Sequence, residues 1–430
     1  MTAPISDHLT PSSPAAPQAV RSVTIAVVLV GAGLCVIVGR DGTPVWQVAR
    51  VALVVALTAA ALAVARGGPK GRPRLGLLGL LGGSVAVAVG VGLAAPHLAK
   101  TGITPVSVAS LLVLLGGVVL LVVGLAGLGR GRRRLVRYPA RALALLVPLL
   151  LTATLGQAVA ATNVPATTLG DRTPADLDLD HRDVTFAAAD GVTLSGWYID
   201  SANGAAVVLL HGAGSTRSAV LDHAAVLARH GYGVLLYDAR GHGRSGGRAM
   251  DFGWYGDEDV AGAVAFLQDQ PAVDPTRIAV VGLSMGGEQA IGAAAAVEGI
   301  GAVVAEGATN RVAGDKGWLS EEYGVRGALS EGIERVTYGF ADLLTEAGPP
   351  PTLRSAVREA GVPTLLIAGG DVGDEPLAAR FVQAGAPDSV EVWVMADTGH
   401  TAGLRTHPQE WEDRVTGFLG DALGVEDATG

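Results

Sequence analysis

Long apolar runs in the N-terminal part of the chain constrain its fold more than any other feature. Between Leu111 and Leu128 no charged residue interrupts the sequence, whereas helices of water-soluble domains alternate polar and apolar faces. A helix rises about 1.5 Å per residue, so roughly 20 apolar residues cross the hydrocarbon core of a bilayer. We therefore predict a transmembrane helical region at residues 23–161. It is built from five runs: Val23–Gly39, Val45–Ala65, Leu75–Ala95, Val106–Leu128 and Ala140–Ala161.

Two basic loops predict the orientation of these spans. Arg66–Arg74 lies between the second and third runs, and Arg130–Arg141 lies between the fourth and fifth. Loops rich in Lys and Arg stay in the cytoplasm, so both loops are expected on that side of the plasma membrane. The fifth span then places the rest of the chain outside the cytoplasm. A signal peptide is a weaker interpretation of the first run, which has no clear cleavage site and precedes four more runs.

The charge is distributed unevenly, which indicates two modules. Residues 1–161 carry a net charge of +12 and residues 162–430 a net charge of −21. An acidic C-terminal module argues against nucleic acid as a partner, because phosphates are neutralised by Lys and Arg. Residues 1–22 are rich in Pro, Ser and Ala and are predicted to be a disordered tail, and residues 162–180 form a polar linker. No spacing of cysteines and histidines suggests a metal, and we expect no cofactor.

Residues 181–425 have the periodicity of an α/β domain. "VTFAAADGVTLSGWYI" predicts two strands joined by a turn at Asp190–Gly191. Continuous apolar runs, typical of strands buried on both faces of a parallel sheet, then alternate with helical segments. These runs are Ala205–Gly212, Gly233–Gly241, Arg277–Ser284, Gly301–Gly307, Pro363–Gly370 and Val390–Asp397. The expected helices are 218–230, 256–270, 286–298 and 408–422, and residues 309–360 break the alternation as a lid-like insertion.

The segment "GLSMGG" predicts a nucleophilic serine. Gly282, Ser284 and Gly286 fill the pattern G-x-S-x-G between a predicted strand and a predicted helix, as a nucleophile elbow requires. In so tight a turn, side chains at the two glycine positions would collide. The alternative is a glycine-rich turn that only packs a helix on a sheet.

A serine nucleophile needs a base, and the base needs an acid. His400, in "DTGH" after the last predicted strand, is the expected base, with His407 as the second choice. His211 and His242 are expected to stabilise their own loops. For the acid, Asp374 is preferred over Asp371 in the loop "DVGDEP". Glu306, which follows the preceding strand, is the third choice.

The tetrahedral oxyanion needs two backbone N–H donors. We expect one from Met285, directly after the serine, and one from Ala213 in the "HGAG" loop.

The order of "HGAGS", "YDARGHGRSGG", "GLSMGG" and "DTGH" resembles the α/β-hydrolase superfamily over Asp183–Leu423. The resemblance implies an α/β-hydrolase fold, with a mostly parallel sheet, and a catalytic triad. "DGVTLSGWYI" is similar to the esterase-like and serine-peptidase-like members. The acid loop departs from the common G-x-x-D spacing, which leaves the choice of acid open.

The expected function is that of a membrane-anchored serine hydrolase, carboxylesterase-like, that cleaves an ester, thioester or amide of a small molecule or peptide. A serine peptidase or amidase of the same fold is the alternative within enzymes. A non-catalytic membrane protein that uses the fold as a binding module is the alternative outside them.

Overall fold

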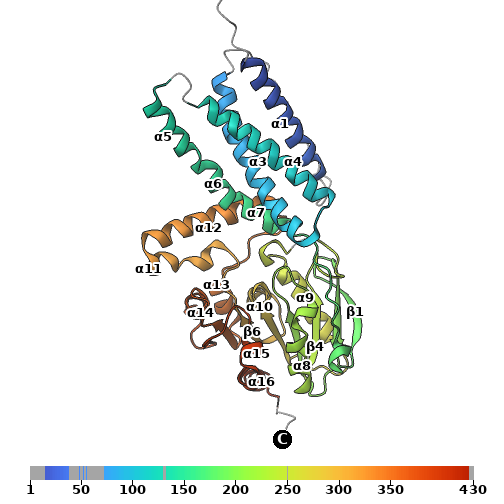
Figure 1. The fold of residues 1–430 in the computed structure, drawn as a ribbon. Helices are drawn as coiled ribbons and strands as arrows, with labels where there is room; N and C mark the ends of the chain where they lie inside the picture. The colour runs from blue at the N-terminus through green and yellow to red at the C-terminus, as the bar shows by residue number, and fades with distance from the viewer. Residues whose placement is uncertain are drawn as a thin grey trace, which may run out of the picture. The chain divides into compact units, whose positions relative to one another are not determined.

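The computed structural model describes residues 15–37, 48, 52, 55, 72–128, 132–248 and 250–425. The chain separates into two units, Met1–Gln157 and Ala158–Gly430 (Figure 1). Each unit is described by itself below.

The N-terminal unit consists of helices that are apolar apart from the basic helix Arg134–Ala144, and some of them approach one another through glycines. They are α1 (Ala15–Ile37), α3 (Arg72–Thr101), α4 (Pro105–Gly127), α5 (Arg134–Ala144), α6 (Leu146–Ala153) and α7 (Leu155–Thr162), which runs into the second unit. A Cβ atom added to Gly83 of α3 would lie 2.5 Å from the Leu121 nitrogen of α4, and one added to Gly124 would lie 2.4 Å from the Leu80 nitrogen. Such close backbone contact through small residues is typical of helix pairs in membranes.

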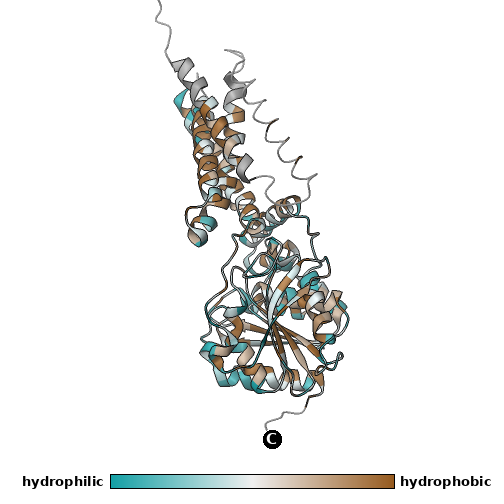
Figure 2. Ribbon diagram, turned by 90° about the vertical axis from the view of Figure 1, so that its right-hand side faces the viewer, coloured by the Kyte–Doolittle hydropathy of each residue, from teal (hydrophilic) through white to brown (hydrophobic). Residues whose placement is uncertain are grey.

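Three stretches in the described part of the chain are long and apolar enough to cross a membrane: Gly76–Thr101, Pro105–Gly127 and Arg134–Thr162. They correspond to the third, fourth and fifth predicted runs to within one residue at Leu75 and Leu128, and Figure 2 shows the N-terminal helices largely in the hydrophobic colour. The first predicted run corresponds to a shorter apolar helix, Val23–Leu34. The second run lies outside the described residues apart from three positions. Five spans and their orientation stay predictions, and α1 begins at Ala15, inside the stretch predicted to be a disordered tail.

The C-terminal unit contains the predicted, mostly parallel sheet. Within the described residues, eight strands pair in the order β1-β2-β4-β3-β5-β6-β7-β8, and β2 runs antiparallel to both of its neighbours. The strands are β1 (Arg182–Ala187), β2 (Thr193–Ile199), β3 (Ala206–Leu210), β4 (Gly233–Asp238), β5 (Ile278–Leu283), β6 (Ile300–Glu306), β7 (Thr364–Gly369) and β8 (Val390–Met395). The predicted hairpin and all six predicted apolar strands are therefore confirmed.

Helices cover both faces of this sheet and bury two separate cores. Along β3, Val208 points into the core beneath α9, α10, α13 and α14, whereas Val207 and Leu209 point into the core beneath α8 and α16. This arrangement explains why the strand has no polar position: each face is covered. The helices are α8 (Leu221–Arg229), α9 (Gly256–Gln268), α10 (Met285–Ala296), α13 (Leu353–Ala360), α14 (Glu375–Gln383), α15 (Gly403–Thr406) and α16 (Pro408–Leu423). Short 3-10 turns occur at Pro174–Leu177, Arg217–Val220, Asp251–Gly253 and Ala313–Lys316.

An insertion follows β6, as the sequence predicts, and consists of α11 (Leu319–Tyr323) and α12 (Val325–Leu344). The predicted insertion, residues 309–360, is too long at its C-terminal end. Its last residues form α13, which belongs to the helical layer that packs on the sheet beside α10. Asp315 closes the neck of the insertion. One of its carboxylate oxygens accepts a hydrogen bond from the Leu353 N–H (2.6 Å), and the other accepts from the Arg311 N–H (2.8 Å) and the Val312 N–H (2.9 Å).

Candidate active site

Ser284 lies on a strained turn between β5 and α10. Its backbone angles are φ 54° and ψ −124°, a conformation that costs a residue other than glycine about 1–3 kcal/mol. The two flanking glycines make the turn possible. A Cβ atom at Gly282 would lie 2.2 Å from the Gly286 oxygen, and one at Gly286 would lie 2.7 Å from the backbone oxygens of Leu210 and His211. The Ser284 N–H donates to the Glu306 carbonyl (2.7 Å), which fixes the turn to β6.

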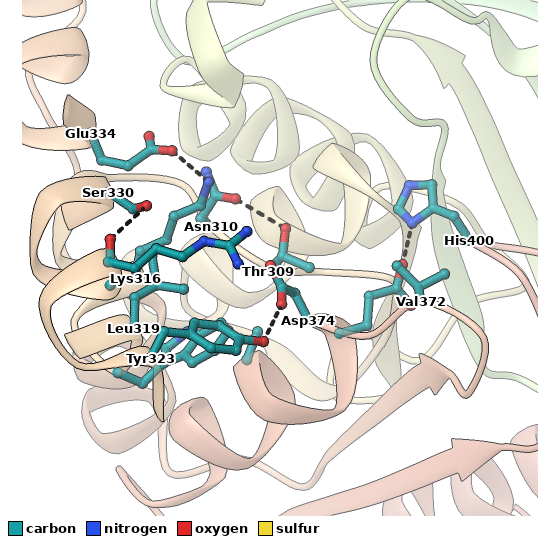
Figure 3. A pocket seen from close by; sticks show the side chains of 15 residues that line it. Thr309, Asn310, Lys316, Leu319, Tyr323, Ser330, Glu334, Val372, Asp374 and His400 are labelled. Carbon is teal, nitrogen blue, oxygen red and sulfur yellow. Dashed lines mark hydrogen bonds and ion pairs between the residues drawn. The ribbon is translucent and has the colours of Figure 1, made fainter. Parts of the chain in front are cut away.

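His400 lies on the loop after β8, and its ring reaches the serine. The distance between His400 Nε2 and Ser284 Oγ is 2.9 Å. The imidazole is half-exposed, and Figure 3 shows it at the edge of a pocket. The structure thus brings together the serine and the histidine that the sequence proposes as nucleophile and base.

Glu375 is the carboxylate that contacts His400, and the structure contradicts the two aspartates expected there. His400 Nδ1 forms a short hydrogen bond with Glu375 Oε1, and Glu375 Oε2 accepts from the Gly369 N–H (2.8 Å). Asp374 is exposed and accepts a hydrogen bond from the Tyr323 hydroxyl (3.0 Å), while Asp371 is exposed at the surface.

The predicted acid, Asp374, is one residue away from the carboxylate that contacts His400, and this error has a local physical cause. Helix α14, which the sequence analysis does not predict, begins at Glu375 with Pro376 in its first turn, a favoured place for proline. The helix start turns successive side chains in different directions, so Asp374 faces the insertion. The longer Glu375 side chain is only 2% exposed and spans the distance to the imidazole.

The buried carboxylate also changes the acidity of the imidazole. The hydrogen bond that His400 Nδ1 donates to Glu375 raises the pKa of His400 above its ordinary value and outweighs partial burial, which lowers it. The negative charges of Glu375, Glu288 and Glu306 contribute in the same direction as the hydrogen bond. A carboxylate in this position favours the imidazolium that forms when the histidine takes a proton.

Glu306, the third candidate for the acid, holds the histidine loop in place. Its Oε1 accepts from the Gly403 N–H (2.8 Å), and its Oε2 accepts from the Trp411 indole N–H (3.0 Å). Burial raises the pKa of this carboxyl. His407, the second choice for the base, instead places its Nε2 3.1 Å from the Ala396 carbonyl.

His211 orients the loop expected to bind the oxyanion. The Ala239 N–H donates to His211 Nε2 (3.0 Å), so the ring proton is on Nδ1 and is donated to the Gly212 carbonyl (2.8 Å). Burial lowers the pKa of His211 to about 4, which keeps the ring neutral. In a trans peptide the N–H points opposite to the C=O, so the Ala213 N–H points away from His211.

The two expected oxyanion donors lie on segments next to the serine. A Cβ atom at Gly212 would lie 3.2 Å from the Ser284 Cβ, so the Ala213 loop passes directly beside the nucleophile. Met285 is the first residue of α10, where backbone N–H groups have no partner within the helix. His242, beside His211 at a ring distance of 5.6 Å, is buried and stabilises the neighbouring glycine turn, with Nδ1 3.0 Å from the Arg240 carbonyl.

Glu288 is a functional candidate that the sequence analysis missed. Its buried Oε1 accepts hydrogen bonds from the N–H groups of Thr309 (3.2 Å) and Asn310 (3.0 Å), and burial raises its pKa to about 7. The feature that could have indicated Glu288 is its position four residues after the serine, on the face of α10 turned away from solvent. It positions the start of the insertion at the edge of the active site.

A pocket of about 610 Å³ lies between His400 and the insertion (Figure 3). The insertion and the residues just before it contribute aromatic, aliphatic and polar side chains, among them Trp318, Leu319 and Tyr323, and the Lys316–Glu334 ion pair (2.7 Å). Val372, Glu375 and His400 form the opposite side. The pocket therefore has a mixed apolar and polar lining, and His400 at its edge connects it to Ser284.

The comparisons with known proteins concern this unit. Residues 207–414 match the alpha/beta hydrolase family. The thiohydrolase aneE of Aspergillus aculeatus is 40% identical over 118 residues, which are 26% of this chain and 37% of the relative. The polyketide transferase grgF of a Penicillium species is 34% identical over 131 residues, 30% of this chain and 45% of the relative. The chain thus spans less than half the length of each relative. The solved structure of the Pyrococcus furiosus esterase Pf2001 is 29% identical, covers 61% of this chain and 99% of the esterase, and has a TM-score of 0.49.

Proposed function

The C-terminal unit belongs to the α/β-hydrolase superfamily, and from this premise we propose that it is a serine hydrolase that cleaves esters or thioesters through Ser284, His400 and Glu375. The observation that carries the proposal is the continuous hydrogen-bonded series from serine to histidine to buried carboxylate on a strained turn. Nucleophile, base and orienting acid in this arrangement are the elements of acyl transfer.

The reaction begins when Ser284 Oγ attacks the substrate carbonyl and His400 Nε2 takes its proton. The N–H groups of Met285 and Ala213 hold the oxyanion, and Glu375 stabilises the imidazolium. When the intermediate collapses, His400 donates the proton to the departing alcohol or thiol and the acyl group stays on Ser284. Water then attacks the acyl-enzyme and gives a proton to His400. When this second intermediate collapses, His400 returns the proton to Ser284 Oγ and the carboxylic acid is released.

A fluorophosphonate probe tests the nucleophile directly. We expect the full chain to be labelled once, at Ser284, and Ser284→Ala to be unlabelled. Absence of labelling in the folded wild-type protein would favour the non-catalytic binding module. Turnover of peptide amides faster than esters would favour the peptidase or amidase alternative.

The long apolar helices support anchoring in a membrane, with five spans and the catalytic unit outside the cytoplasm as the proposed arrangement. A reporter that is active only outside the cytoplasm, fused after Gly430, should be active, and the same reporter in the Arg130–Arg141 loop should be silent. The reverse pattern would contradict this topology.

A further inference from the structure

Helix α12 of the insertion carries an apolar stripe that no other described part of the C-terminal unit covers. The stripe consists of Val325, Leu329, Ile333, Val336 and Leu343, whose exposed fractions range from 37% to 80%. Spacings of four, four, three and seven residues place these side chains on one side of a helix. The glycines beside the stripe, Gly332 and Gly339, have open space where a Cβ would be, with no atom within 4 Å.

The opposite side of the same helix forms part of the pocket. Gly327, Ser330 and Glu334 line the cavity that also contains His400. Helix α12 therefore has one side that lines the pocket and an opposite side that is apolar and exposed. A partner bound to the exposed side would be separated from the pocket by this single helix.

The chain itself suggests what binds there. The last stretch apolar enough to cross a membrane ends at Thr162, and β1 begins at Arg182. The connection spans at most about 70 Å even when fully extended, so a bilayer that holds the apolar helices is within reach of the catalytic unit. A helix with a continuous aliphatic face and a polar opposite face is the kind that lies in a membrane interface.

We propose that the outer stripe of α12 binds the surface of a lipid bilayer, so that the pocket takes its acyl substrate from the membrane. The charge of the insertion favours lipids with zwitterionic headgroups. Residues Leu319–Leu344 carry five acidic and two basic side chains, and this excess of negative charge opposes binding to anionic lipid.

The contact is tested by fluorescence on the full chain, with no need for enzyme activity. Cys35 is the only cysteine, so Leu329→Cys in a Cys35→Ser background carries a single environment-sensitive fluorophore. Arg335→Cys on the same helix, exposed but off the stripe, is the matched control. In phosphatidylcholine nanodiscs with one copy each, nitroxide-labelled lipid should quench the probe at 329 at least about twofold more than at 335.

Two fluorescence results would overturn the proposal. The first is equal, weak quenching at both positions, which would leave the stripe in water. The second is a probe at 329 that is shielded from water only when several copies share a disc, which would make the stripe an interface between two copies of the chain. Discs that contain anionic lipid should give weaker quenching than pure phosphatidylcholine discs.

A kinetic test rests on the proposed hydrolase activity. Leu329→Ser with Val336→Ser should lower the hydrolysis of a long-chain p-nitrophenyl ester in vesicles about tenfold, since two aliphatic contacts are removed. Hydrolysis of water-soluble p-nitrophenyl acetate should stay within about twofold, as should both rates in Arg335→Gln. An unchanged long-chain rate would refute membrane delivery of substrate. A wild-type protein inactive on both esters would refute the hydrolase proposal, and the fluorescence result would still decide the lipid contact.

Discussion

Replacing Glu375 by Gln tests the role of the buried carboxylate, because glutamine keeps the shape and changes only the hydrogen bonding. Glu375 accepts from the Gly369 N–H with one oxygen and from His400 with the other. Glutamine has one oxygen and one NH₂ group. If its NH₂ faced the Gly369 N–H, two buried donors would oppose each other at a cost of about 1–3 kcal/mol.

The glutamine oxygen is therefore expected to face Gly369 and its NH₂ to face His400. His400 Nδ1 must then accept a hydrogen bond, which moves the ring proton to Nε2, the nitrogen that faces Ser284 Oγ at 2.9 Å. A protonated Nε2 cannot take the serine proton. Loss of the correct tautomer in a triad costs about 10⁴ in kcat, which corresponds to roughly 5.5 kcal/mol of transition-state stabilisation.

The assay is kcat/KM on p-nitrophenyl acetate, together with thermal unfolding to show that the variant is folded. The matched controls are Asp374→Asn and Asp371→Asn, each expected to stay within about fivefold of wild type since both side chains are exposed. A Glu375→Gln enzyme with near-normal turnover, or a loss of comparable size in Asp374→Asn, would refute this assignment of the acid.

Four further outcomes follow from the geometry. Ser284→Ala and His400→Ala should each lower kcat at least about 10³-fold with little change in unfolding temperature, and the double variant should be no worse than either; additive losses would contradict a shared mechanism. Since Glu375 raises the pKa of His400 and the base must be neutral, kcat/KM should rise with pH through a midpoint above 6.5; a midpoint below that value would contradict the hydrogen bond. Glu288 has a pKa of about 7 in the folded protein, so the folded state binds the extra proton and the free energy of unfolding falls as pH rises from about 4.5 to 7. Glu288→Gln should therefore raise the unfolding temperature more at pH 8 than at pH 5, and a difference independent of pH would argue against a titrating carboxyl. Gly286→Ala should destabilise the fold by about 1–3 kcal/mol, since its Cβ would meet backbone oxygens at 2.7 Å; an unchanged unfolding temperature would show that the turn has room.

The sequence was sufficient to predict the sheet, because its central strands β3 to β7 are buried on both faces and so have continuous apolar sequences. Ser284 could also be located, since a side chain at Gly282 would collide with the backbone of Gly286, only four residues away. These signals are local, and local geometry is what a sequence pattern encodes.

The acid could not be predicted to the residue because its assignment depends on where a helix begins. Asp371, Asp374 and Glu375 lie within five residues of one another, and the directions of the Asp374 and Glu375 side chains are set by the start of α14. Element boundaries are the least reliable part of a sequence-based assignment. The role of Glu306 could not be predicted either, because its two partners, Gly403 and Trp411, are about 100 residues away in the sequence.

The neck at Asp315 has a consequence for how such enzymes diversify. One carboxylate accepts from the backbone N–H groups on both sides of the insertion, so the chain leaves the catalytic sheet and returns to it at nearly the same point. A segment joined in this way can change length cheaply, because doubling a loop costs only about 0.6 kcal/mol of closure entropy. Natural variation or laboratory recombination at residues 316 and 352 can therefore exchange a segment that lines the pocket and leave the Ser284 turn, His400 and Glu375 untouched.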